Sequence, residues 1–570
     1  MRKGFCKDLS IFAFKINQSL LMTKLSDKTI QILIIVIGSF LFIPFIGQSH
    51  LFDWDEINFA EAAREMLVTN DWLTVQINYL PFWEKPPLFI WMQALSMKVF
   101  GINEFAARFP NAICGIVTLL VLFRLGRSIL NSKLGLLWTL LYACSILPFI
   151  YFKSGIIDPW FNLFIFLGIY NISAFTRSTD KLHRYRFVGL SALFIGLGIL
   201  SKGPVALLVF GLVTVIYFIV KKFKVKFNLW HVILFLIISL FVGGFWFILQ
   251  TLNGNSEIVK DFFVYQVRLF QTEDAGHGGF LFYHFVVLCI GVFPASIYAF
   301  LYLKRFQKDE RLVFFEFKTW MVILLWTVLI LFTIVKTKII HYSSLAYFPL
   351  TFIAAFYIYK LLEQKESLPK WIKTMLLSLG FVWSLIVVAL QFVAMNKEKI
   401  TEMNLIKDDF AVGNLQAQVH WTGFEFLIGA LFFVALLFIF LSKRLTTQNQ
   451  IIASLIATLL FIYSTVVVIV PKVEGYTQNA AIEFYKSRQN EDCYVKTVGF
   501  KSYADLYYTA KKPTKNLNSN LENWLIFGAI DKPVYFVMKN TRSEEFTKNF
   551  PHIKRIGEKN GFVFYKREVE

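Results

Sequence analysis

The chain alternates long apolar runs with short polar stretches over most of its length. A membrane-spanning helix needs roughly 20 mostly apolar residues, and thirteen runs approach that length. The pattern therefore predicts an α-helical polytopic membrane protein with about 13 transmembrane helices. The expected spans are Thr29–Ile46, Ala107–Leu125, Leu134–Phe152, Trp160–Phe175, Phe187–Leu200, Pro204–Val220, Val232–Leu249, Phe280–Leu303, Trp320–Val335, Ser343–Leu361, Trp371–Phe392, Phe424–Leu441 and Ile451–Val470.

Three polar segments between the expected spans are long enough to carry chemistry: Gln48–Ala106, Thr251–Gly279 and Asn396–Trp421. In the first of them, apolar residues recur at helical spacing over Asn58–Val68 and Leu88–Phe100 without filling a span. That pattern predicts two helices that lie at the membrane interface.

The tail after the last span is polar and mixes two periodicities. Strand-like runs stand at Tyr494–Val498, Val534–Met538 and Gly561–Tyr565, and helix-like runs at Thr477–Ser487 and Ser543–Asn549. This mixture indicates a small α/β domain. We therefore expect a transmembrane domain over residues 1–470, with interface helices in the outer loop 48–106, and an extracytoplasmic α/β domain over residues 471–570.

Composition supports a lipid environment. Charged residues make up 17% of the chain, against about 25% in an average soluble protein, and the mean hydropathy is +0.56. The net charge of +20 does not indicate nucleic acid, because the Lys and Arg residues stand in short runs between apolar segments, as in cytoplasmic loops. The five cysteines show no CxxC spacing, which argues against a disulfide framework or a zinc site.

Basic residues gather in every second connection between the expected spans, the pattern typical of cytoplasmic loops. The runs are Arg2–Lys28, Arg124–Lys133, Arg177–Arg186, Lys221–Lys226, Lys304–Lys318, Lys365–Lys373 and Lys443–Arg444. An odd number of spans then leaves the N-terminus in the cytoplasm and the C-terminal region outside. The basic N-terminal stretch carries no cleavable signal pattern, so we expect the first span to be retained.

The first outer loop concentrates acidic residues where the chain leaves the membrane. It reads DWDEINFAEAAREML and then WEKPPLFIWMQ, with Asp55 and Glu56 in the first block and Glu84 and Lys85 in the second. Carboxylates at the mouth of a span are costly unless they are exposed, paired or functional. Ordinary polarity beside the membrane explains one such acid, but it explains less well the combination with an EKPP turn and interface helices.

Cationic and hydrogen-bonding residues stand at other outer span ends, where the positive-inside rule predicts few of them. Each cation taken alone is explained by a side chain that extends along the membrane surface. Taken together they predict a site for an anionic group, and phosphate suits clustered Lys and Arg. The residues are Lys202 in SKGPVA, Arg268 in the second outer segment, and Lys336, Lys338, His341 and Tyr342 in VKTKIIHYS, with the acid Asp158 at another outer junction.

An acidic centre beside a cationic cluster at the membrane surface fits a sugar carried on a lipid phosphate. The lipid tail would lie between spans, the phosphate on the cations and the sugar toward the acids. An acid could then deprotonate an acceptor hydroxyl while the cations stabilise the departing phosphate.

The motifs also resemble a known family. Asp55–Glu56 with AEAAREML, then Glu84-Lys85-Pro86-Pro87-Leu88, then FAARFPNA, followed by SKGPVA and TKIIHYS, resemble the family 39 glycosyltransferases in order and content. The EKPPL form resembles the bacterial lipid A aminoarabinose transferases more than the protein O-mannosyltransferases. The likeness covers roughly the first 360 residues, and the tail matches no motif of the family.

The resemblance implies a C-type glycosyltransferase fold and an inverting reaction from a polyprenyl-phosphate sugar, in a bacterial inner membrane. It implies that Asp55 is catalytic, that Lys85 places Asp55 and the donor phosphate, and that Asp158 is the second acid. With Glu84, these form the expected catalytic set. The expected donor-phosphate contacts are Lys85, Lys202, Arg268, Lys336, Lys338, His341 and Tyr342. The resemblance leaves the acceptor open between a lipid similar to lipid A and another acceptor at the outer face of the membrane.

No spacing demands a cofactor, although a divalent cation could sit where Asp55, Glu84 and Asp158 approach each other. The expected partners are the lipid-linked donor, a lipid or protein acceptor and membrane lipids, with no nucleic acid, and we expect a monomer. A transporter or lipid flippase is the main alternative, but it favours ionisable residues at mid-span and inverted repeats. A membrane-anchored assembly protein and a protein O-mannosyltransferase-like enzyme stay open, as do the sugar, the acceptor and the role of the tail.

Overall fold

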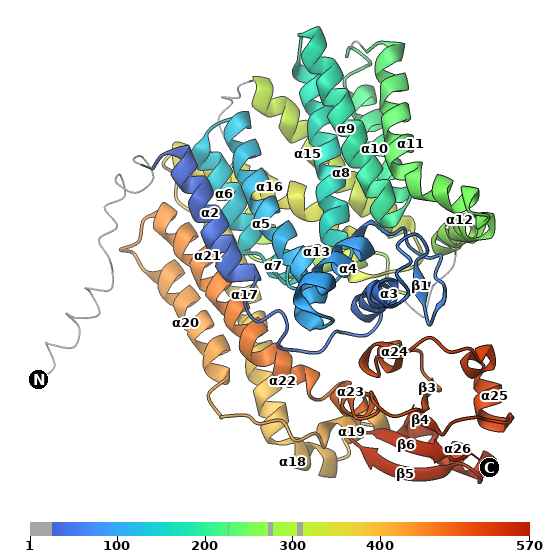
Figure 1. The fold of residues 1–570 in the computed structure, drawn as a ribbon. Helices are drawn as coiled ribbons and strands as arrows, with labels where there is room; N and C mark the ends of the chain where they lie inside the picture. Colours follow the sequence, from blue (N-terminus) through green and yellow to red (C-terminus); the bar gives the residue numbers. More distant parts are fainter. Residues whose placement is uncertain (1–24, 226, 272–277, 305–311, 570) are drawn as a thin grey trace, which may run out of the picture.

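The computed structural model describes residues 25–225, 227–271, 278–304 and 312–569. Helices fill one end of the molecule and a small sheet with its helices forms the other (Figure 1). Most of the N-terminal basic run, at residues 1–24, lies outside the described part. The longer membrane helices are α2 (Asp27–Phe42), α5 (Glu104–Ile129), α6 (Ser132–Ala143), α8 (Asp158–Arg177), α9 (Lys181–Lys202), α10 (Val205–Val220), α11 (Leu229–Leu252), α15 (Leu312–Ile334), α16 (Tyr347–Glu363), α17 (Lys370–Met395), α20 (Phe426–Leu441) and α21 (Thr447–Ser464).

The expected helical membrane fold is confirmed, but the spans differ in length. In the described part of the chain, seven helical segments are long and apolar enough to cross a membrane. An eighth is present if α13 (Tyr283–Gly291) and the segment Ala295–Leu303, bent by 106°, form one broken span. Each of the thirteen expected runs coincides with a helix or a broken helix. The helices at the other expected spans, beyond these seven or eight, are shorter, interrupted or less apolar. The run Leu134–Phe152, for example, breaks at Ser145 into α6 and α7 (Ile146–Tyr151).

The two outer-loop helices expected from periodicity are present. They are α3 (Asp55–Thr69) and α4 (Leu88–Phe100), joined by a hairpin of β1 (Gln76–Ile77) and β2 (Leu80–Pro81). Helix α3 begins three residues earlier than predicted. Trp54 precedes it with a φ of 75°, a rare conformation for a bulky residue, so the chain turns sharply into the helix at Asp55.

The C-terminal region contains a four-stranded mixed sheet of order β3-β4-β6-β5. The strands are β3 (Tyr494–Val498), β4 (Val534–Lys539), β5 (Lys554–Lys559) and β6 (Phe562–Arg567), and only β3 and β4 run parallel. The first, second and fourth match the predicted runs. Periodicity missed β5 because this exposed edge strand reads KRIGEK, and charged residues are common on edges. The helices around the sheet are α23 (Asn479–Lys486), α24 (Ala504–Tyr508), α25 (Glu522–Phe527) and α26 (Ser543–Asn549).

The remaining helices are short or amphipathic. They are α12 (Ser256–Gln271), α14 (Ala295–Ala299), α18 (Lys397–Glu402), α19 (Asp409–Leu415) and α22 (Val470–Glu474). Short 3₁₀ segments stand at η1 (Phe300–Leu303), η2 (Ile340–Ala346), η4 (Leu517–Asn520) and η5 (Asn540–Arg542), and a π-helical segment at η3 (Thr465–Ile469).

Two hydrophobic cores position the outer loop. One lies among the membrane helices. The other joins apolar residues of the first outer loop, such as Ile57 and Ile90, to residues of the C-terminal region, such as Ile482 and Tyr507. Because α3 and α4 share this core with α23 and α24, the C-terminal region packs directly on the loop that carries the candidate acids.

Candidate active site

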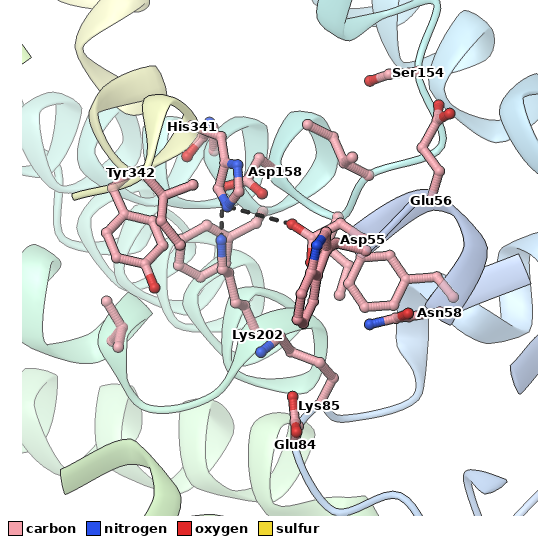
Figure 2. A pocket seen from close by; sticks show the side chains of 18 of the residues that line it. Asp55, Glu56, Asn58, Glu84, Lys85, Ser154, Asp158, Lys202, His341 and Tyr342 are labelled. Carbon is pink, nitrogen blue, oxygen red and sulfur yellow. Dashed lines mark hydrogen bonds and ion pairs between the residues drawn. The ribbon is translucent and has the colours of Figure 1, made fainter. Parts of the chain in front are cut away.

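A cavity of about 670 Å³ opens between the first outer loop and the ends of the membrane helices. Charged and polar side chains come from the start of α3, the EKPP turn, the start of α8, the end of α9 and the α15–α16 connection (Figure 2). Further ones come from α12 and from Lys501 in the C-terminal region. The other wall of the cavity is apolar. The apolar side chains are Phe52, Phe59, Phe82, Ile156, Ile157, Phe161, Ile165, Val205, Val209, Phe332, Val335, Ile339 and Leu345.

Asp55 is the first residue of α3 and points into the cavity toward His341. Its Oδ2 lies 3.4 Å from Nε2 of His341, and its side chain keeps 35% of its surface exposed. A carboxylate at a helix N-terminus is stabilised by the helix dipole. Asp55 therefore has a fixed position and an oxygen that a substrate can reach.

Asp158 lies across the cavity and is already paired. Its Oδ1 is 2.7 Å from Nζ of Lys202, and its side chain is 5% exposed against 18% for the lysine. The Lys202 ammonium also lies 5.6 Å from the centre of the Phe161 ring and 5.5 Å from that of Tyr342. Asp158 thus holds the more exposed lysine at the cavity wall.

Lys85 supplies a second cation from the EKPP turn. Its ammonium lies 5.2 Å from the centre of the Tyr265 ring on α12, and the Arg268 guanidinium lies 5.1 Å from the same ring. Burial lowers the pKa of Lys85, while the carboxylates of Glu84 and Asp55 act in the opposite direction. Tyr265 therefore lies close to two cations that line one cavity.

Two of the predicted phosphate ligands do not line the cavity. Lys338 is 7% exposed, and its ammonium donates to the carbonyls of Phe332, Thr333 and Val335 at 2.9, 2.7 and 2.6 Å. It caps the C-terminal end of α15, where carbonyls lack helical partners. Lys336 is exposed and is absent from the lining. The other predicted residues do line it: Asp55, Glu84, Lys85, Asp158, Lys202, Arg268, His341 and Tyr342.

Glu56, next to Asp55, has a supporting position. It is 4% exposed and forms a two-point ion pair with Arg108, at 2.7 and 3.0 Å. It also accepts hydrogen bonds from the backbone N–H groups of Phe52 and Gly155. The pKa of Glu56 is lowered, because the Arg108 charge and these hydrogen bonds outweigh burial. Glu56 fixes the start of α3 against α5 and the α7–α8 connection.

Several lining residues were not predicted, and three of them are Asn58, Trp54 and Lys501. Asn58 lies one turn after Asp55 on the same helix face, and its buried Oδ1 has no hydrogen-bond partner in the described part of the chain. The spacing of three could have indicated it. Trp54 and Lys501 meet at the rim, with the Lys501 ammonium 5.2 Å from the centre of the Trp54 ring. No sequence signal links a tail lysine to the first outer loop.

A resident metal ion is not indicated by the side-chain arrangement. Within the described residues, no group of three or more His, Cys, Asp or Glu side chains is arranged to hold one. The carboxylates of Asp55 and Asp158 instead pair with His341 and Lys202.

Solved structures resemble the whole chain. The ArnT of Cupriavidus metallidurans, solved bound to undecaprenyl phosphate, superposes with a TM-score of 0.74 and 16% identity, covering 95% of this chain and 98% of that one. The chain has the C-type glycosyltransferase fold. The same protein in the apo state gives a TM-score of 0.72, with 15% identity and coverage of 94% and 97%.

Sequence comparisons point the same way. The family model of dolichyl-phosphate-mannose–protein mannosyltransferases matches residues 84–246. The undecaprenyl phosphate-α-4-amino-4-deoxy-L-arabinose arabinosyl transferase of Pectobacterium carotovorum is 25% identical over 343 residues, which is 59% of this chain and 60% of that protein. Its counterpart in Pectobacterium atrosepticum is 25% identical over 345 residues, with the same coverage. The chain thus spans about 60% of the length of these relatives, and it resembles the family that its motifs indicated.

Proposed function

We propose that this protein is an inverting glycosyltransferase that moves a sugar from a polyprenyl-phosphate donor to a lipid acceptor at the outer face of the membrane. The observation that carries the proposal is a single cavity that combines an accessible carboxylate, a set of cations and a long apolar wall. A lipid-linked sugar phosphate needs all three of these features.

The apolar wall suits the lipid tail of the donor. Val205 and Val209 on α10 and Ile165 on α8 continue the cavity between membrane helices. An isoprenoid chain there stays in apolar surroundings, as it does in the bilayer, so its tail is not exposed to water while the donor is bound. The phosphate then reaches the polar end, where Lys85, Lys202 and Arg268 can donate charge-assisted hydrogen bonds.

The accessible acid faces the sugar. In the proposed step, an acceptor oxygen attacks the anomeric carbon, the bond from that carbon to the phosphate oxygen breaks, and polyprenyl phosphate leaves with the electron pair. A hydroxyl acceptor passes its proton to Asp55, whereas an anionic phosphate acceptor has no proton to lose. In that second case Asp55 orients the acceptor and stabilises positive charge on the sugar.

The two cavity acids have different tasks. Asp158 is buried and its charge is matched by Lys202, so it positions that lysine for the leaving phosphate. Asp55 is more exposed, and the histidine at 3.4 Å keeps it oriented. The cations stabilise the charge that develops on the leaving oxygen, which is where preorganised donors contribute most.

The relatives' names support the polyprenyl-phosphate donor. Undecaprenyl phosphate occurs in the names of the Pectobacterium proteins and in the description of the Cupriavidus structure. We further propose that the protein is a monomer in a bacterial inner membrane, with its N-terminus in the cytoplasm as the alternation of basic connections predicts. The region 471–570 would be an extracytoplasmic domain beside the acceptor, because Lys501 brings it to the cavity rim.

The test is sugar transfer by purified protein in lipid vesicles. Radiolabelled undecaprenyl-phosphate sugars are mixed with a bacterial membrane lipid extract, and labelled lipid is followed by chromatography. We expect transfer by the parent protein and a loss of at least 100-fold in Asp55→Asn, in line with general base or electrostatic roles. Glu398→Gln removes an exposed acid on α18 and should leave the rate unchanged.

Two results would contradict the proposal. One is an absence of transfer from every polyprenyl-phosphate sugar to lipid or to added protein. The other is equal transfer by the parent and Asp55→Asn. Label that appears on protein instead of lipid would retain the transferase reaction and reject the lipid acceptor.

A further inference from the structure

A second cavity, of about 650 Å³, lies in the C-terminal region. Its walls are the α23–β3 connection, the edge strand β3, the segment from α24 to η4, and the loop before β4. One residue from the first outer loop, Asn78, completes it. The residues at the catalytic end of the first cavity do not line this one, so its chemistry is separate from the proposed sugar transfer.

The charges of this second cavity favour an anion. Six basic and four acidic side chains line it, but two of the acids are already used, because Glu491 pairs with Arg488 and Asp492 with Lys532. The uncommitted charge is therefore mainly positive. It comes from Lys496, Lys511, Lys512 and Lys515.

Lys511 is held in place without a matching charge. Its ammonium donates to the amide oxygen of Asn78 at 2.5 Å and to that of Asn520 at 3.3 Å. Both partners are neutral, so neither of them cancels the charge of the ammonium. The burial of Lys511 lowers its pKa, and the nearby Asp505 carboxylate acts against that shift.

The remaining lining groups suit hydroxyls. Amide side chains both donate and accept hydrogen bonds, and five of them line the cavity: Asn78, Gln489, Asn490, Asn516 and Asn520. Asp505 also lines it and is 4% exposed, and its Oδ1 has no hydrogen-bond partner among the described residues. A buried polar atom without a partner is rare in a folded protein, and a sugar hydroxyl is a donor of the kind that Asp505 lacks.

We propose that this second cavity binds a phosphorylated saccharide, with its phosphate on Lys496, Lys511 and Lys512 and its hydroxyls on the amides and Asp505. The cavity is larger than a phosphate ion needs, so it has room for a sugar whose hydroxyls reach the amide side chains. Bound saccharide also contacts Asn78 of the outer-loop hairpin, and Asp505 stands four residues after Lys501 at the rim of the first cavity. The same short segment therefore borders both cavities.

Binding is tested by calorimetry on the full-length protein in detergent, with glucose 1-phosphate, inorganic phosphate and glucose as separate probes. We expect glucose 1-phosphate to bind at least tenfold more tightly than either of the others. Lys496→Gln and Lys512→Gln should each weaken it by about tenfold, the loss of one charge-assisted hydrogen bond. Lys554→Gln, an exposed change on β5, should not affect it.

The first cavity could also take a sugar phosphate, so Lys85→Gln is the decisive companion variant. Binding that persists in Lys85→Gln and weakens in Lys512→Gln assigns the probe to the second cavity. Binding that is lost in Lys85→Gln alone overturns the inference, as does equal affinity for inorganic phosphate. Since Lys512 is exposed, its replacement tests the site without disturbing the packed core. The measured affinity for glucose 1-phosphate does not depend on whether the protein transfers sugar.

Discussion

At the scale of single residues, the cavity separates charges that are used in folding from charges that a substrate can reach. Glu56 and Arg108 neutralise each other in a buried pair, at 3–4% side-chain exposure. Asp55, the neighbour of Glu56 in the sequence, faces the cavity with a third of its surface open. Residue type and spacing do not distinguish these two adjacent acids. The family resemblance selected Asp55, and the position of Arg108 on α5 gives the physical reason why Glu56 is not available.

Replacing Glu56 by Gln should destabilise the protein strongly. It leaves the Arg108 guanidinium buried without a counter-charge, and breaking a buried pair in this way costs about 3–5 kcal/mol. The measurement is the thermal unfolding temperature in detergent, with Glu398→Gln as the control. A Tm as high as that of the control would show that the pair does not hold α3 in place.

The pH dependence of donor binding should reflect Lys85. Burial lowers its pKa from the usual 10.5, so its charge is lost at a lower pH than that of a free lysine. The KM for the donor should therefore rise as the alkaline pH passes this lowered pKa. In Lys85→Arg the guanidinium stays charged throughout, and the rise should disappear. The same alkaline rise in both proteins would assign it to another group.

At the scale of elements, helix ends decide which predicted ligands are available. Asp55, Asp158 and Lys202 all stand at helix termini that meet at the cavity. Lys338 stands near a terminus too, but its ammonium turns back onto the carbonyls of α15. A motif such as VKTKIIHYS shows that cations are present, whereas the direction of each side chain depends on where the helix ends.

Lys338→Met should separate these two roles. Because the lysine caps α15, its loss leaves three carbonyls without this donor, and we expect a lower Tm. The KM for the donor should change less than twofold. Lys202→Met, which removes a cation that lines the cavity, should raise that KM by about tenfold or more. A comparable rise in KM for Lys338→Met would restore it as a phosphate ligand.

Much of the fold was accessible from the sequence, because membrane helices and interface helices follow from local apolar patterns. Strand β3 and helices α4 and α26 match their predicted bounds. Local patterns do not encode where a long helix breaks, as at Ser145, nor the meeting of Lys501 with Trp54, which depends on the packing of the tail. Eight of the residues that line the cavity were predicted from the motifs. Asn58 was missed although its spacing of three from Asp55 could have indicated it, whereas the place of Lys501 required the three-dimensional arrangement.

At the scale of the whole molecule, the C-terminal region and the outer loop act as one packed body. Their shared core joins α3 and α4 to α23 and α24. Charges from both parts act on Asp505: Lys496 and Lys511 lower its pKa, Asp53 and Glu61 raise it, and burial is the largest effect. The pKa of Asp505 is raised from 3.8 to about 6.

This shift predicts a pH dependence of stability. The folded protein keeps a proton on Asp505 up to about pH 6, and the unfolded chain only to about 3.8. The stability contributed by this proton is full at low pH and is lost as the pH rises through that window. Asp505→Asn should therefore be more stable than the parent above the window, by up to about 3 kcal/mol, and lose this advantage near pH 4. The measurement is the difference in Tm between Asp505→Asn and the parent, above the window and near pH 4. The same difference at both pH values would contradict the raised pKa of Asp505.

The central claim is that the cations of the first cavity bind the phosphate of a polyprenyl lipid. Equilibrium binding of undecaprenyl phosphate to the purified protein tests it most directly, with Lys85→Gln compared with Lys336→Gln, a lysine outside the cavity. We expect Lys85→Gln to raise the Kd by about 10- to 100-fold, as the loss of a charged hydrogen bond does, and Lys336→Gln to leave it unchanged. An unchanged Kd in Lys85→Gln, or equal weakening in both variants, would contradict the account.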